Sequence, residues 1–147
     1  SAGSTDILLC KLDAAGNFLW AKSIGGAGYD VASNIKLDPS GNIFITGVLG
    51  SHQTPIDLDP GPGTYTLVSA GNEDIFIEKL DASGNFLWAK GIGGTNLEVV
   101  KSIATDAAGN IYMTGQFYTT SGSSNIPVDF DPGPGTFFRR VLPMCLF

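Results

Sequence analysis

An internal repeat is the feature that most limits what this chain can fold into. Residues 6–26, DILLCKLDAAGNFLWAKSIGG, match residues 74–94, DIFIEKLDASGNFLWAKGIGG, at an offset of 68 residues, and 16 of the 21 positions are identical. Residues 38–47 match residues 106–115 at the same offset. A repeat of this length is typical of solenoids, propellers and other arrays, in which each unit buries its apolar face against the next unit.

The repeat divides the chain into two units of similar length and a short tail. We expect repeat 1 at residues 1–68, repeat 2 at residues 69–140 and a divergent C-terminal tail at residues 141–147. Two later segments, IDLDPGPGTY at residues 56–65 and VDFDPGPGTF at residues 128–137, match at an offset of 72, because four residues are added in the loop before the second copy. The chain therefore consists of two tandem copies of one structural unit.

Each repeat has the pattern of short strands joined by tight turns. Apolar runs such as ILLCKL and NIFITGVL lack the three-to-four spacing of a helix, and glycines and prolines separate them. The pentapeptide D-x-x-G-N stands between two such runs four times, at Asp13, Asp38, Asp81 and Asp106. Its Asp can bond the turn backbone and its Gly can adopt the left-handed conformation. We expect an all-β fold with four or five antiparallel strands per repeat and these pentapeptides at the hairpin tips.

Two further matched features predict how the strands pack. Trp20 and Trp88 follow Phe18 and Phe86 by two residues, and alternate residues of a strand share one face. We therefore expect each aromatic pair to pack between neighbouring sheets, with carbohydrate stacking by the tryptophans as the alternative. The glycine doublets of SIGG and GIGG are expected where an outer strand crosses to the next sheet.

These segments, taken in order, resemble a known family. The run D-I-F-x-x-K-L-D-x-x-G-N-x-x-W-A-K-x-x-G-G, followed by D-x-x-G-N-x-Y-x-T-G and D-F-D-P-G-x-G-T, is similar to the SBBP beta-propeller repeat of large secreted or surface-attached bacterial proteins. The resemblance implies blades of four antiparallel strands around a central axis, and an extracellular scaffolding, adhesion or binding role without catalytic residues. Two repeats are too few for a closed propeller, which typically has four to eight blades. We therefore expect an incomplete propeller that self-associates, for example as a trimer, or an excerpt of a longer array.

The charge balance limits the partners. The chain has 14 acidic and 8 basic residues and a formal charge of −6, so it lacks the basic surface that nucleic acid or an anionic membrane requires. No apolar run reaches the roughly 18 residues of a membrane span. We expect no nucleic acid and no membrane insertion. The expected partners are further copies or neighbouring repeats and a protein or glycan ligand, outside the cell or on its surface.

Cysteine and histidine offer little chemistry. Cys10 and Cys145 do not form a C-x-x-C spacing, and they are either two free buried thiols or one disulfide. The single histidine, His52, lies in a predicted loop. One histidine removes most zinc sites and most Ser-His or Cys-His catalytic schemes from consideration.

The DPGPG segments are the strongest candidates for a site. They lack the lysine of a phosphate-binding loop and the third acid and bidentate Glu of an EF-hand. A looser calcium loop remains, in which Asp57 and Asp59, and Asp129 and Asp131, project carboxylates to one side of an extended segment. The alternative is a stiff corner in which the prolines fix the backbone and the aspartates bond exposed N–H groups. No cofactor other than this calcium is indicated.

Carboxylates are the remaining candidates for catalysis. Glycosidases use two carboxyl groups at a defined separation, and Asp30, Glu73, Glu78 and Glu98 are available beyond the turns. Glu78 aligns with Cys10 and Glu98 with Asp30, so the repeats do not keep one residue at these positions and the spacing selects no pair. We therefore expect a non-catalytic scaffold or binding module. The alternatives are a calcium-stabilised structural array and a fragment of a propeller hydrolase.

Overall fold

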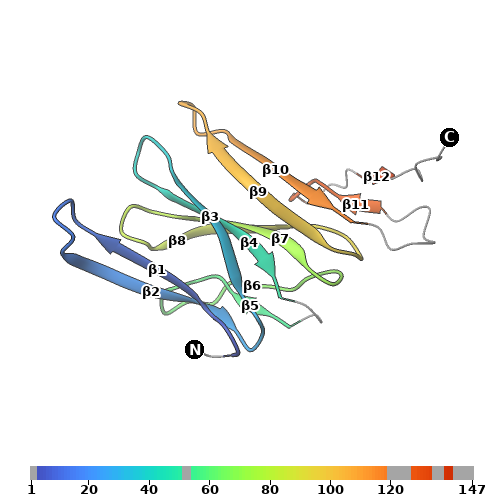
Figure 1. Ribbon diagram of the computed structural model, residues 1–147, viewed down its shortest axis with the longest axis horizontal. Helices are drawn as coiled ribbons and strands as arrows, with labels where there is room; N and C mark the ends of the chain where they lie inside the picture. Colours follow the sequence, from blue (N-terminus) through green and yellow to red (C-terminus); the bar gives the residue numbers. More distant parts are fainter. Residues whose placement is uncertain (1–2, 51–53, 119–126, 134–137, 141–147) are drawn as a thin grey trace.

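The fold is built of β-strands in antiparallel sheets. The computed structural model describes residues 3–50, 54–118, 127–133 and 138–140, and within these residues it contains twelve strands and no helix, so none that could span a membrane (Figure 1). The strands are β1 (Ile7–Leu12), β2 (Phe18–Gly26), β3 (Val31–Leu37), β4 (Ile43–Leu49), β5 (Ile56–Asp57), β6 (Thr66–Leu67), β7 (Asp74–Leu80), β8 (Phe86–Ile92), β9 (Glu98–Thr105), β10 (Ile111–Phe117), β11 (Pro127–Asp129) and β12 (Phe138–Arg140). The predicted all-β class is confirmed.

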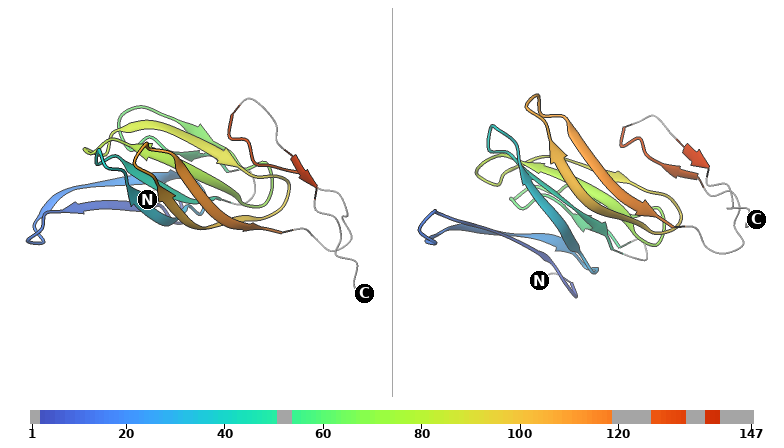
Figure 2. Two further views of the ribbon diagram at one scale, coloured as in Figure 1. Left: turned by 90° about the horizontal axis from the view of Figure 1, so that it is seen from above. Right: turned by 45° about the horizontal axis from the view of Figure 1, so that its top comes forward.

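The sheets are offset from the sequence repeats by half a repeat. Strands β3-β4-β7-β8 form one four-stranded sheet, the middle sheet, which takes two strands from each repeat. The first sheet, β1-β2-β5-β6, lies on one side of it, and the third sheet, the β9–β10 hairpin, lies on the other (Figures 1 and 2). The three sheets stand next to one another like blades but do not close into a ring. The predicted β-propeller type is therefore confirmed in an open form, while the repeat boundaries stay a sequence prediction.

The short hairpin β5–β6 includes one strand, β5, that the sequence pattern did not predict, whereas β6 lies in the apolar run YTLVS, residues 65–69, which the pattern favours as a strand. In the described part of the chain each repeat supplies six strands, β1–β6 and β7–β12, rather than four or five. Strand β5 pairs with the end of β2, where Gly25 is opposite Asp57 and Gly26 is opposite Ile56. It also pairs with β6. The first DPGPG segment is consequently the loop of a hairpin that extends the outer edge of the first sheet.

The four D-x-x-G-N turns share one geometry. At the first turn, Asp13 Oδ1 accepts the N–H groups of Ala15 and Asn17 at 2.9 and 2.8 Å, and Asp13 Oδ2 accepts the Asn17 side-chain amide at 2.8 Å. The same three hydrogen bonds recur at Asp38, Asp81 and Asp106. The turn glycines have φ angles between 79° and 85°, as a left-handed turn position requires. The predicted hairpin tips are confirmed.

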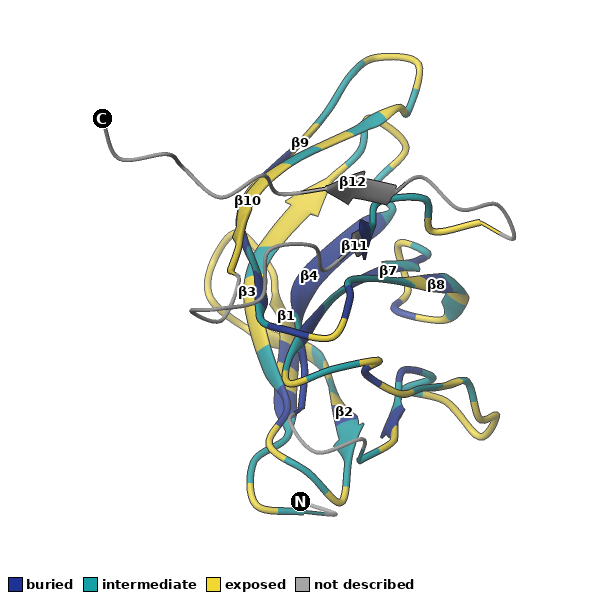
Figure 3. Cartoon of the chain, turned by 90° about the vertical axis from the view of Figure 1, so that its right-hand side faces the viewer, coloured by how far each residue is buried: buried dark blue, intermediate teal, exposed yellow. Residues whose placement is uncertain are grey.

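The core lies between the sheets. One cluster of buried side chains joins the first and middle sheets and includes Leu9, Ile24, Ile45 and Phe76. A smaller cluster of Phe44, Ile77 and Ile103 joins the middle and third sheets. Strands β4 and β7 are the most continuously buried strands (Figure 3), and each fully buried side chain of this size contributes about 1.5–3 kcal/mol. The middle sheet is thus covered on both faces.

The aromatic pair of repeat 2 does not share one face. Trp88 packs edge-on against Phe44, with ring centroids 6.2 Å apart, on the side of the third sheet. Phe86 packs against Tyr65, with centroids 4.8 Å apart, on the side of the first sheet. A register shift between β7 and β8 leaves Leu87 without a partner in the ladder, and such a bulge reverses the face of the next residue. The prediction of a common face is wrong for this pair, although both rings do pack between sheets.

Candidate functional site

The first DPGPG segment is held by its own aspartates. Asp57 Oδ1 accepts the N–H groups of Asp59 and Tyr65 at 3.1 and 2.9 Å. Asp59 Oδ1 accepts the N–H group of Gly61 at 2.7 Å. These backbone hydrogen bonds hold the loop between β5 and β6 in the way that the corner interpretation describes.

The second DPGPG segment repeats these bonds where the structure describes it. Asp129 Oδ1 accepts the N–H group of Asp131 at 3.0 Å, and Asp131 Oδ1 accepts that of Gly133 at 2.7 Å. No group of three or more His, Cys, Asp or Glu side chains in the described residues converges as a metal site. Each loop by itself thus brings together two acids, and the calcium interpretation of the four aspartates stays a prediction.

Glu78 is an acid in the middle of an otherwise well-packed strand. Its side chain is 0% exposed, and neither carboxyl oxygen has a hydrogen-bond partner. Burial, and then the neighbouring negative charge of Asp59, raise the pKa of Glu78 to about 8. Sequence comparison passed over Glu78 because its counterpart in repeat 1 is Cys10. The available signal was a single acid flanked by apolar residues at the centre of DIFIEKL.

A pair of acids stands where the chain crosses from the middle sheet to the third sheet. Asp74 Oδ2 accepts the N–H group of Ala70 at 2.7 Å, and Glu98 Oε2 accepts that of Gly94 at 3.0 Å. The other oxygens, Asp74 Oδ1 and Glu98 Oε1, are buried without a hydrogen-bond partner. Burial raises the pKa of both carboxyls, and the charge of Asp74 adds to the shift at Glu98.

Repeat 1 has the matching pair at the crossing from the first sheet to the middle sheet. Asp30 Oδ2 accepts the N–H group of Gly26 at 2.7 Å, and burial followed by the charge of Asp6 raises the pKa of Asp30. A Cβ atom on Gly25 would lie 2.9 Å from Asp6 Oδ1 and 3.1 Å from Asp30 Oδ2, so the glycine makes room for both carboxyls. The glycine doublets therefore do lie at the predicted crossings.

Sequence reasoning missed these crossing pairs because it treated Glu98 and Asp30 as a mismatch. Both are acids, and each follows an identical aspartate, Asp74 or Asp6, by 24 residues. The conserved property is the carboxyl group rather than the side-chain length. Glu73, the remaining sequence candidate, forms a parallel bridge with Leu97 beside this crossing.

The two outer sheets expose apolar positions that the middle sheet buries. Leu8 on β1 is 75% exposed, whereas its repeat counterpart on β7, Phe76, is 0% exposed. Tyr112 on β10 is 59% exposed, whereas its counterpart on β4, Phe44, is 0% exposed. Among the described residues, no strands take the two places before β1 in the first sheet or the two places after β10 in the third sheet.

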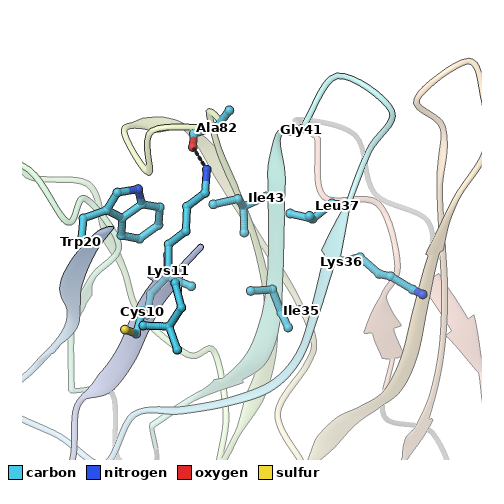
Figure 4. A pocket seen from close by; sticks show the side chains of 11 residues that line it. Cys10, Lys11, Trp20, Ile35, Lys36, Leu37, Gly41, Ile43 and Ala82 are labelled. Carbon is cyan, nitrogen blue, oxygen red and sulfur yellow. Dashed lines mark hydrogen bonds between the residues drawn. The ribbon is translucent and has the colours of Figure 1, made fainter. Parts of the chain in front are cut away.

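An apolar groove of about 520 Å³ lies between the first and middle sheets (Figure 4). Its walls come from β1 to β4 and include Trp20, Ile35 and Ile43. Lys11 extends across one end, where its Nζ donates a hydrogen bond to the Ala82 carbonyl at 3.2 Å. Apolar side chains dominate this groove, and Ile35 is 56% exposed in it.

The remaining sequence candidates have little part in these sites. Cys10 is a free thiol and is exposed, contrary to the expectation of a buried one. Cys145 and His52 lie outside the described residues. Both tryptophans are half-buried and pack against a core cluster, where Trp88 contacts Phe44, while Trp20 also lines the groove.

Neighbouring antiparallel sheets of this kind, repeated in tandem, define a β-propeller repeat protein. Residues 19–48 match the family model described as SBBP, Beta-propeller repeat. Residues 19–48 therefore carry the SBBP beta-propeller repeat, and the family predicted from the sequence is confirmed for this segment. The matched segment begins within β2 and ends within β4, so it spans the crossing from the first sheet to the middle sheet.

Two curated relatives are similar over most of the chain. An uncharacterized WD repeat-containing protein, L264, of Acanthamoeba polyphaga mimivirus is 29% identical over 125 residues, which cover 80% of this chain and 9% of that protein. The regulatory protein FlaEY of Caulobacter vibrioides is 27% identical over 135 residues, which cover 90% of this chain and 13% of that protein. The chain thus spans about a tenth of the length of these relatives. No solved structure matches it.

Proposed function

We propose that this chain is a non-catalytic segment of a β-propeller, acting as a scaffold or as a binding surface for protein or glycan, outside the cell or on its surface. Its two open ends are the observation that carries this proposal. In the part of the chain that the structure describes, no strand pairs with the free edge of β1 or with the free edge of β10, whereas β4 pairs with β7 at the corresponding place in the middle sheet. The free edge of β10 at one end can therefore pair with the free edge of β1 at the other end of a second copy.

The middle sheet supplies a template for joining the ends. Within the chain, β4 pairs with β7 in a register that sets Ile45 opposite Glu78. Shifting this pairing by one repeat of 68 residues gives β10 of one copy paired with β1 of the next, with Met113 opposite Cys10. The occupant of the open edge is a further copy of this chain or, in a longer array, a neighbouring repeat.

The same shift fills the apolar groove. Phe44 packs on Trp88 and lies under the Lys79 ammonium, whose Nζ is 4.8 Å from the ring centroid. The counterparts one repeat earlier are Trp20 and Lys11, which border the groove (Figure 4). Tyr112 of the preceding copy, whose β10 pairs with this β1, takes the position of Phe44. Covering these exposed side chains removes apolar area from water at about 25 cal/mol per Å².

The names of the relatives support the same class of role. One is called WD repeat-containing and the other regulatory, and repeat propellers of this kind commonly present surfaces to partners. A ligand bound by the assembled chain would be detected on glycan arrays or by affinity capture with defined surface proteins. Absence of any ligand would leave the scaffold role alone.

Cysteine cross-linking tests the proposed edge pairing. In a Cys145→Ser background, Met113→Cys is expected to form a disulfide with native Cys10 of a second copy, giving a covalent dimer or a ladder of multimers on a non-reducing gel. The control is Thr114→Cys, whose side chain points to the other face of β10. This variant is expected to form far less disulfide-linked dimer. A dilution-stable monomer by light scattering, without cross-linking, would overturn the assembly of free copies.

A further inference from the structure

Glu78 lacks the partner that a buried acid needs. Strand β7 runs between β4 and β8, where Glu78 is opposite Ile45 on one side and Ala89 on the other. Both of its oxygens are buried and have no hydrogen bond. A buried carboxyl in such surroundings is neutralised by a proton or by a cation.

The first DPGPG loop lies over Glu78. The Tyr65 hydroxyl donates a hydrogen bond to the Ala89 carbonyl at 3.0 Å, which fixes the end of the loop above the strand residue beside Glu78. The neighbours of Glu78 on the same face, Phe76 and Leu80, pack in one cluster with Leu58 of the loop. Leu58 precedes Asp59 in the chain, so this packing brings the Asp59 carboxyl near Glu78, and its charge accordingly contributes to the raised pKa of Glu78.

The two carboxylate oxygens of Asp59 have different neighbours in the loop. Asp59 Oδ1 accepts the Gly61 N–H, while Asp59 Oδ2 lies against Gly63, where a Cβ atom would collide with it. Asp57 has another task, because its Oδ1 accepts two loop N–H groups. Asp57 thus shapes the loop, and Asp59, which follows the packed Leu58 in the chain, is the loop acid whose charge acts on Glu78.

We propose that Glu78 and Asp59 bind one divalent cation, best matched by Ca²⁺, between the middle sheet and the first DPGPG loop. Carboxylate oxygens are the hard ligands that Ca²⁺ prefers, and both oxygens of Glu78 are available for bidentate binding. The described residues hold no converging group of three acids, so loop carbonyls and water complete the shell. The cation would neutralise two acids and join the first sheet to the middle sheet.

The second loop serves as an internal control. Asp129 and Asp131 make the same backbone hydrogen bonds. The counterpart of Glu78 in repeat 1 is Cys10, so a loop that docks on the first sheet of a second copy meets a thiol instead of a carboxylate. The proposal therefore expects one tightly held ion per chain, whether or not the ends of the chain are joined.

Calcium titration of the full chain tests this site. Isothermal titration calorimetry is expected to give one Ca²⁺ per chain, and a hundredfold excess over Kd is expected to raise Tm by about 5–10 °C relative to excess chelator. Glu78→Gln should abolish both effects and stay folded in chelator, because it removes a buried charge. Asp59→Asn should weaken binding strongly. The matched control, Asp131→Asn, should keep one ion per chain.

The proposal is overturned if wild-type chain shows neither calcium heat nor a Tm difference from chelator, or if Glu78→Gln binds as well as wild type. It is also overturned if Tm in chelator rises on acidification while calcium has no effect, because a proton then neutralises Glu78. If Asp131→Asn lost as much calcium binding as Asp59→Asn, the binding would belong to the acidic surface in general and the proposal would be overturned. Light scattering on the same samples reports assembly separately, so failure of the ion site and failure of the scaffold proposal are distinguishable.

Discussion

The first sheet and the middle sheet contain nearly the same β-hairpin in two different surroundings. In the middle sheet, β7–β8 is flanked by β4 and covered on both faces, and Phe76, Ile77 and Leu80 of β7 are buried. In the first sheet, β1 is an edge strand, and no other described strand pairs with its free edge. Leu8, Leu12 and Phe18 of this hairpin are exposed. The sequence is shared but the burial is not. Burial in this protein is therefore a property of the neighbouring sheet more than of the strand itself.

The largest expected effect comes from truncating one position in both sheets. Phe76→Ala should cost about 3–5 kcal/mol, because the ring is fully buried and leaves a cavity. The counterpart Leu8→Ala should cost less than about 0.5 kcal/mol, because that side chain is largely in water. Urea unfolding, at a concentration where light scattering reports a monomer, measures both. Similar costs would mean that the face of the first sheet is already covered, which contradicts the comparison.

The next effect is the pH dependence of the unfolding free energy, which is expected to depend on Glu78 and not on its repeat counterpart, Cys10. The pKa of Glu78 is about 8 in the folded chain against an ordinary 4.5. A carboxyl whose pKa rises on folding binds its proton more tightly in the folded state, so this contribution to stability is full below about pH 4.5 and is lost as the pH rises through 8. The loss should be about 3–5 kcal/mol in chelator, at about 1.4 kcal/mol per pH unit.

Variants at the two matched positions isolate this contribution. Glu78→Gln should flatten the fall of unfolding free energy between pH 5 and 8, whereas Cys10→Ser should leave it unchanged, because Cys10 is exposed. Chemical denaturation across this pH range provides the measurement. An unchanged slope in Glu78→Gln would assign the pH dependence to the crossing acids, Asp74 and Glu98, instead.

A smaller effect should be equal in the two sheets. Gly16 in the first sheet and Gly41 in the middle sheet have φ angles of 85° and 81°, and added Cβ atoms would meet nothing closer than 3.5 Å. Gly16→Ala and Gly41→Ala should therefore each cost about 1–2 kcal/mol, the penalty of a left-handed conformation. Their difference in urea unfolding should stay below about 0.5 kcal/mol. A large difference would show that turn geometry also depends on the neighbouring sheet.

The smallest effect is a shift in the titration of the turn aspartates. Hydrogen bonds from the following Asn and the turn backbone lower the pKa of Asp13 and Asp38, and Lys79, 3.4 Å from Asp38, adds to the second shift. A lowered pKa gives stability that is present at neutral pH and lost on acidification. Carboxyl chemical shifts in NMR titrations should show both values below normal. Added salt should move Asp38 more than Asp13 if the Lys79 contact persists in solution.

Local patterns predicted the turns and the class of fold correctly. Asp13 and its three counterparts have hydrogen bonds within five residues, so the sequence alone contains the information. The faces of Phe86 and Trp88 could not be predicted, because the bulge at Leu87 depends on how β8 meets β7. The short strand β5 was missed for a similar reason. It is two residues long and exists through its pairing with β2 and β6.

The candidate site was predictable in part. The DPGPG aspartates were site candidates from the sequence, since they recur at matched positions, but nothing in the repeat pattern connected them to Glu78, which lies on a strand of the middle sheet. The crossing acids were visible in the sequence and were set aside because Asp30 and Glu98 differ in length. Comparison by carboxyl chemistry instead of by identity would have found them.

The half-repeat offset between sequence and sheet has a mechanical consequence. Since the middle sheet takes two strands from each of the two repeats, force applied along the chain must break the β4–β7 ladder before the repeats can separate. That ladder joins seven residue pairs. Backbone hydrogen bonds between β4 and β7 consequently join the neighbouring repeats. An array built in this way would resist mechanical unfolding at the boundaries between its sequence repeats.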